Sequence, residues 1–181
     1  MTCLVNLFIF PEVLFTMAMH SIKMVQKIPA PPEQVWDFYS SHANLQIITP
    51  PQMKFRIISQ DYEEKLYSGQ IIEYKVKPVL NIPLYWKTEI KNVTPPTYFM
   101  DEQRKGPYSS WQHQHFFKAI EGGTEMTDVV LYKNLSGFIG ELANVLFIKQ
   151  KLRNIFVFRF QKTEEIFGKW QGGQDMVIKI R

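Results

Sequence analysis

The segment Ser109–Asn134, SSWQHQHFFKAIEGGTEMTDVVLYKN, decides the fold. It contains two runs of alternating polar and apolar residues, and Gly122-Gly123 lies between them. A period of two is typical of a β-strand with one buried face. Two glycines between such runs are a hairpin signal, because glycine adopts the backbone angles that tight turns need. The segment therefore predicts an antiparallel β-hairpin.

The length of the loop sets which side chains face each other across this hairpin. If the two glycines form the whole loop, Glu121 faces Thr124. Counting outward, we expect the pairs His113 with Tyr132, His115 with Val130, and Phe117 with Asp128. All of these side chains and Trp111 then share one face of the sheet.

The preceding run, residues 97–103, predicts a third strand beside this hairpin. Side-chain parity sets Asp101 across from His113 and Gln103 across from Trp111. Burying a carboxylate or an imidazole without a partner costs several kcal/mol. We therefore expect the inward polar groups to bond one another or to line a cavity. The inward set comprises Asp101, Gln103, Trp111, His113, His115, Asp128 and Tyr132.

The rest of the chain completes an α+β order. A strand at 20–28 precedes two short helices, and alternating runs at 54–59, 69–78 and 84–93 predict further strands. An apolar segment at 137–168 with helical spacing predicts one long helix. We expect a curved seven-stranded antiparallel sheet around the long C-terminal helix. Tyr74 and Trp86 then face inward as well.

Arg159 is a cation on the otherwise apolar face of the predicted long helix. Such a guanidinium either extends to the surface or reaches an acid such as Asp128. Turned inward, it can also hold the carboxylate or phosphate of a bound molecule. We expect the inward orientation.

Composition indicates one domain, at residues 20–168 of the 181-residue chain. The net charge of +4 comes from scattered lysines and arginines, which does not favour nucleic acid as a partner. The single cysteine, Cys3, suits a reducing, cytoplasmic compartment. Residues 1–19 have no Lys or Arg and are split by Pro11, so we expect a weakly ordered extension without stable membrane insertion. Residues 169–181 are expected to be a fraying tail.

Several runs resemble a known superfamily: PPEQVWDFYS, LQIITPP, YSGQIIEYKV, DEQRKGPYSSWQHQHFF and MTDVVLY. Together with the element order, they are similar to bacterial START-like proteins, also called the SRPBCC or polyketide cyclase-like superfamily. The resemblance covers about residues 20–168. It implies the helix-grip fold of the birch pollen allergen, with an internal cavity for a lipid or another hydrophobic small molecule. It implies no catalytic residues that map onto this chain.

Three functions remain open at this stage. The first is non-catalytic binding or transport of a hydrophobic molecule, at a site comprising the inward set, Tyr74, Trp86 and Arg159. The second is an enzyme of cyclase, dehydratase or hydrolase type, because acid–histidine pairs transfer protons. The third is a regulatory module that binds a protein partner. We expect no cofactor and no metal, because ligands beyond the two histidines would have to come from Asp101 or Asp128.

Overall fold

The computed structural model describes residues 19–59, 65–77, 82–134, 147–174 and 176–181. The expectation for the N-terminal extension lies almost wholly outside these residues, as does the first part of the predicted long helix. Within the described ranges, no helix combines the length and the apolar character needed to cross a bilayer.

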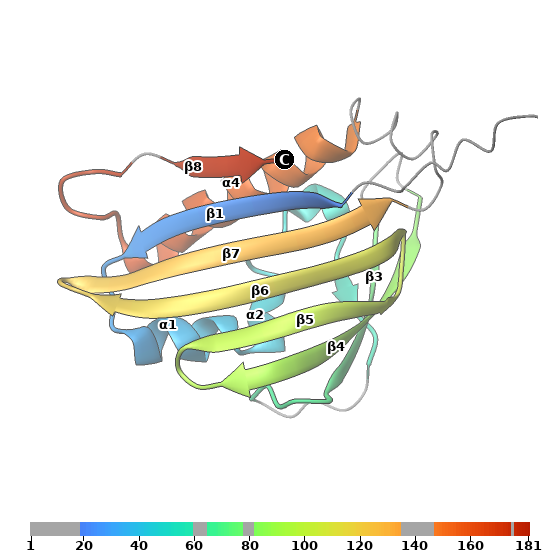
Figure 1. Cartoon of the computed structure of the whole chain (residues 1–181), viewed down its shortest axis with the longest axis horizontal. Helices are drawn as coiled ribbons and strands as arrows, with labels where there is room; N and C mark the ends of the chain where they lie inside the picture. The colour runs from blue at the N-terminus through green and yellow to red at the C-terminus, as the bar shows by residue number, and fades with distance from the viewer. Residues whose placement is uncertain (1–18, 60–64, 78–81, 135–146, 175) are drawn as a thin grey trace, which may run out of the picture.

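The chain forms an antiparallel sheet with helices on one side of it (Figure 1). The described residues give eight strands in the order β2-β3-β4-β5-β6-β7-β1-β8. Figure 1 shows α1, α2 and α4 behind the sheet in that view. The first part of the chain forms β1 (His20–Ile28), α1 (Pro32–Tyr39), α2 (His42–Leu45), the 3-10 helix η1 (Pro51–Met53), β2 (Arg56–Ile57) and β3 (Ile71–Val76). The remainder forms β4 (Leu84–Thr94), β5 (Tyr98–Lys105), β6 (Tyr108–Ile120), β7 (Gly123–Asn134), α4 (Lys149–Phe167) and β8 (Val177–Ile180).

The α+β class and the long C-terminal helix are confirmed, but the strand count of seven is wrong. The tail predicted to fray contains β8, which pairs with β1 from Val25↔Val177 to Ile22↔Ile180. Backbone hydrogen bonds between Ser21 and Arg181 extend this pairing. Ile178 and Ile180 pack against the core beneath α4, and this burial holds the strand.

The β6–β7 hairpin exists, but its predicted register is wrong by two residues. Ile120 pairs with Gly123, so Glu121 and Gly122 form the turn. Gly122 has a φ of +82°, in the left-handed region that favours glycine. Gly123 instead lies within β7, where a Cβ atom would come within 2.1 Å of the Ile28 carbonyl oxygen. The loop therefore uses one glycine for the turn and the other for close packing.

A shift of two residues leaves every side chain on its predicted face. Burial alternates regularly along β7, and His113, His115 and Phe117 are the buried residues of β6. The observed partners of His113 and His115 on β7 are Val130 and Asp128. Asp101 pairs with His113 and Phe99 with His115, as expected.

Two apolar clusters fill the space between the sheet and the helices. One lies under α1 and includes Trp36, Phe99 and Phe117. The other lies under α4 and includes Tyr132, Phe156 and Phe160. A hydrogen bond of 2.6 Å between the Tyr39 and Thr163 hydroxyls ties α1 to α4. The two helices are thus joined to each other as well as to the sheet.

Candidate functional site: a cavity with an acid–histidine cluster

A cavity of about 320 Å³ lies between the sheet and the helices. The inward side chains of β3 and β4, the helices α1 and α2, and the face of α4 all contribute to its wall. Most of this wall is apolar and aromatic, which is typical of sites for small hydrophobic molecules. Seven of the residues expected at the site line the cavity: Tyr74, Trp86, Asp101, Trp111, His113, His115 and Arg159.

The other three expected site residues lie elsewhere. Gln103 is used in the β5–β6 turn, where its amide donates to the Tyr108 carbonyl at 2.8 Å. Asp128 and Tyr132 face inward, but both are fully buried beneath the cavity wall. The alternation of side chains along a strand predicts which residues lie on the inner face of the sheet. It does not predict how far the cavity extends beneath α4.

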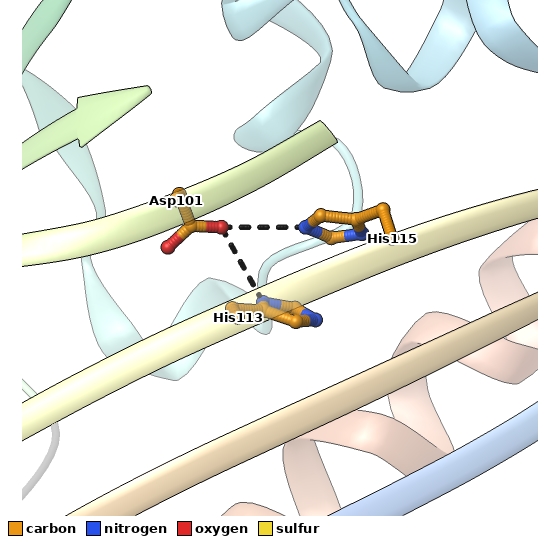
Figure 2. Close-up of side chains that lie close together, drawn as sticks. All are labelled: Asp101, His113 and His115. Carbon is orange, nitrogen blue, oxygen red and sulfur yellow. Dashed lines mark hydrogen bonds and ion pairs between the residues drawn. The ribbon is translucent and has the colours of Figure 1, made fainter. Parts of the chain in front are cut away.

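Two acids and two histidines form a closed cluster at one wall of the cavity. Asp101 Oδ2 lies 3.6 Å from His113 Nδ1 and 3.3 Å from His115 Nε2 (Figure 2). Asp128 Oδ1 lies 3.2 Å from His113 Nε2 and 2.7 Å from His115 Nδ1. Each histidine therefore bridges Asp101 on β5 and Asp128 on β7. The two imidazole rings are 3.9 Å apart.

Two details of the expected hydrogen-bond network are wrong. An Asp101-His113-Tyr132 chain was expected, but the register shift makes Asp128 the second acid beside His113. The expectation that His115 faces only Val130 and Phe99 is also wrong. His115 does stack on Phe99, at 4.2 Å, but it contacts both acids as well.

Burial and charge act in opposite directions on these groups. Burial and the neighbouring His115 lower the pKa of His113, despite its contacts with the two acids. Burial also opposes protonation of His115, but Asp128 and Asp101 outweigh it and raise the pKa of His115. Burial alone would raise the pKa of Asp128, yet His115, His113 and Arg159 hold it well below its usual range. His115 is therefore the more readily protonated of the two histidines, and Asp128 beside it is held as a carboxylate.

Aromatic side chains form the adjoining wall. Trp86 stacks on Tyr74 at 5.9 Å and meets Trp111 edge-on at 5.3 Å. The Tyr74 and Thr88 hydroxyls share a hydrogen bond of 3.2 Å. Burial, followed by the charge of Asp101, raises the pKa of Tyr74, so its phenol stays neutral. This part of the wall is aromatic and largely uncharged, as an apolar guest requires.

Arg159 takes the inward orientation expected from the sequence. Arg159 is only 8% exposed and lines the cavity. Its guanidinium lies 5.8 Å from the Phe156 ring, and Nε has no hydrogen-bond partner among the described residues. The buried Trp86 Nε1 likewise has none within the described part of the chain. Buried donors without partners are uncommon in proteins, and they indicate groups that a ligand can satisfy.

The sequence reasoning missed the contribution of the short helices to the cavity. Tyr39 and His42 line it, and burial raises the pKa of Tyr39 to about 12 and lowers that of His42. Tyr108, at the start of β6, lines it too. The apolar stripe of α1 was visible in the sequence, but which of its residues border a cavity depends on distant contacts.

Comparison with known proteins supports the fold alone. No family model and no curated protein matches the sequence. Protein CV1439 from Chromobacterium violaceum matches the structure with a TM-score of 0.62 at 9% identity, over 83% of this chain and 99% of that one. Protein Ms6760 from Mycobacterium smegmatis matches with a TM-score of 0.59 at 16% identity, over 81% and 89%. Ara h 8.0201 matches with a TM-score of 0.54 at 14% identity, over 82% and 99%. The chain has the expected helix-grip architecture.

Proposed function

We propose that this protein binds a hydrophobic small molecule, without transforming it, in the cavity between the sheet and α4. The observation that carries the proposal is the combination of an apolar, aromatic wall with a buried guanidinium whose Nε has no hydrogen-bond partner among the described residues. Apolar walls supply affinity, and a few polar groups fix orientation. Arg159 is positioned to hold an acidic or otherwise electron-rich end of the guest.

The cavity size sets the expected affinity. A guest that buries about 300 Å² of apolar surface gains roughly 7 kcal/mol at about 25 cal/mol/Å², before the cost of association. Apolar contacts alone therefore give micromolar binding at best. Tighter binding requires the polar groups of the wall, and these groups then determine which molecule is selected.

The proposal is tested by filling the cavity. Val76 is a buried residue of its wall, and Val76→Phe introduces a phenyl ring there. Val129 lies on the opposite face of the sheet, so Val129→Phe makes the same change away from the cavity. Binding is followed by the fluorescence of phenylnaphthylamine, a neutral apolar probe.

We expect Val76→Phe to weaken probe binding by about tenfold or more, because the ring occupies guest volume, while Val129→Phe binds as the wild type does. Thermal unfolding establishes that both variants are folded. Equal probe affinity in Val76→Phe and the wild type would show that the cavity is not the binding site.

An enzyme acting on a similar molecule is a second candidate. The observation that favours it is the exposure of Asp101, His113 and His115 to the cavity, where an imidazole beside a carboxylate can move a proton. Loss of turnover in His113→Gln with retained probe binding would support catalysis. Probe binding without turnover on any cyclisable or hydrolysable analogue would support binding alone.

A further inference from the structure

Three potential metal ligands converge at the wall of the cavity. The ligand atoms of Asp101, His113 and His115 all lie within 4.8 Å of one another. Figure 2 shows one nitrogen of each ring directed at the same carboxylate oxygen of Asp101. From this arrangement, we propose that the cluster binds one divalent transition-metal ion of the Zn²⁺ class. This proposal replaces the sequence-based expectation of a site without metal.

The separations match a tetrahedral site. Zn²⁺ lies about 2.0–2.1 Å from His nitrogens and carboxylate oxygens, so neighbouring ligands in a tetrahedral site are about 3.3 Å apart. Asp101 Oδ2 lies 3.3 Å from His115 Nε2 and 3.6 Å from His113 Nδ1. Both acid–histidine separations are therefore close to the tetrahedral value, and the ligand atoms of the three residues all lie within 4.8 Å of one another.

Metal binding requires a ring nitrogen with a free lone pair on each histidine. A neutral imidazole carries one N–H, so a histidine that donates to Asp128 presents a lone pair at its other nitrogen. The nitrogens that face Asp101 Oδ2 are His113 Nδ1 and His115 Nε2, and a metal ion bound there takes the place of any proton that they carry. A metal ion satisfies all three groups at once.

Asp128 provides the outer support that metal-binding histidines usually have. Ligating imidazoles commonly donate their second N–H to a carboxylate, which fixes the ring and its tautomer. His113 Nε2 lies 3.2 Å from Asp128 Oδ1 in hydrogen-bond geometry. His115 Nδ1 lies 2.7 Å from the same oxygen, although not at a hydrogen-bonding angle. One buried carboxylate thus hydrogen-bonds the His113 ring and lies in close contact with the His115 ring.

The two carboxylates offset the charge of a divalent ion. Two neutral imidazoles and the Asp101 carboxylate leave a net charge of +1, which the buried Asp128 carboxylate neutralises, and the nearby Arg159 cation then favours an anionic fourth ligand. Asp101, His113 and His115 all line the cavity, so the fourth coordination position opens toward the bound molecule. Three protein ligands with an open position are typical of metal sites that contact a small molecule.

The test is a Co²⁺ and Zn²⁺ titration of the full, untagged chain after treatment with a chelator, with no organic ligand present. We expect one Co²⁺ per chain with the visible absorption of four-coordinate cobalt, displacement of Co²⁺ by Zn²⁺, and a rise in Tm with Zn²⁺. His115→Gln and Asp101→Asn should each weaken binding by more than about 100-fold, and Asp128→Asn by about 10- to 100-fold. His42→Gln, which removes another imidazole that lines the cavity, should bind as the wild type does.

Absence of cobalt absorption and of any Tm rise in the folded wild type would overturn the proposal. Equal affinity in wild type and Asp101→Asn would overturn it too, because the ion would then be bound elsewhere. Asp101 is partly exposed, so its isosteric amide variant remains a usable test if a histidine variant fails to fold. The titration uses metal alone, so a negative result leaves the proposed binding of a hydrophobic molecule unaffected.

Discussion

Replacing Arg159 with methionine tests whether its guanidinium anchors a ligand or stabilises the fold. Arg159 is 8% exposed, and its Nε finds no hydrogen-bond acceptor in the described part of the chain. Methionine keeps most of the side-chain volume and removes the charge. A buried charge carries a desolvation cost of several kcal/mol, and an apolar side chain in place of an unpaired one removes that cost. Asp128 loses the Arg159 charge but keeps the two imidazoles at 3.2 and 2.7 Å.

We therefore expect Arg159→Met to leave stability unchanged or to raise it by up to about 2 kcal/mol. For a chain of this length, such a gain corresponds to a Tm increase of roughly 4–8 °C. Differential scanning calorimetry measures this shift. Arg153→Met is the matched control, because Arg153 is an exposed arginine on the same helix. Its Tm should move little.

The same variant should lose its preference for acidic ligands. Anilinonaphthalene sulfonate and phenylnaphthylamine share one apolar framework, and only the first carries a negative charge. A hydrogen bond to a charged group contributes about 1.5–3 kcal/mol, which corresponds to roughly 10- to 150-fold in affinity. Arg159→Met should lose this factor for the sulfonate and little for the neutral probe. Fluorescence titration of both probes measures the difference.

One pair of results would refute this reasoning. If Arg159→Met lowers Tm by several degrees and weakens both probes equally, Arg159 is a structural partner of Asp128. The guest would then be held by apolar contacts alone, and selectivity would have to come from the acid–histidine cluster.

Two further predictions concern the framework around the site. Gly123→Ala should destabilise the protein by more than about 2 kcal/mol in urea unfolding, because its Cβ atom would meet the Ile28 carbonyl oxygen. Gly122→Ala should cost only about 1 kcal/mol, since it strains the turn without a close contact; the reverse order would contradict the observed turn. Removal of residues 174–181 deletes β8 and should lower the free energy of unfolding by about 2 kcal/mol, because the packing of Ile178 and Ile180 is lost. An unchanged urea midpoint would show that β8 does not stabilise β1.

Side-chain alternation was sufficient to predict the inner face of the sheet. The burial of His113, His115 and Asp128 follows from parity, and parity survives an error of two residues in register. The error arose because Gly122-Gly123 is compatible with two neighbouring turns. The observed turn places Gly123 against Ile28 on β1, and this contact cannot be read from the local sequence pattern.

Contacts between distant parts of the chain account for what the sequence did not predict. The run at 177–180 is only four residues long, and its position beside β1 depends on apolar packing. Gln103 has the parity of an inward residue, but the adjacent turn offers the Tyr108 carbonyl to its amide. Tyr39 and His42 reach the cavity only because two short helices pack over the sheet. Local periodicity carries no information about such placements.

The existence of the cavity follows from the width of the sheet. Eight strands about 4.8 Å apart form a sheet roughly 34 Å across, whereas one helix covers about 10 Å. On the sheet, α1 mainly contacts β6 and β7, and α4 mainly contacts β1 and β8. Within the described residues, these two helices do not reach the inner side of β3, β4 and β5, and side chains such as Trp86 and Tyr74 border the cavity there. The acid–histidine cluster, on β5–β7, lies where the covered and uncovered parts of the sheet meet, and polar groups there can serve both the core and a bound molecule.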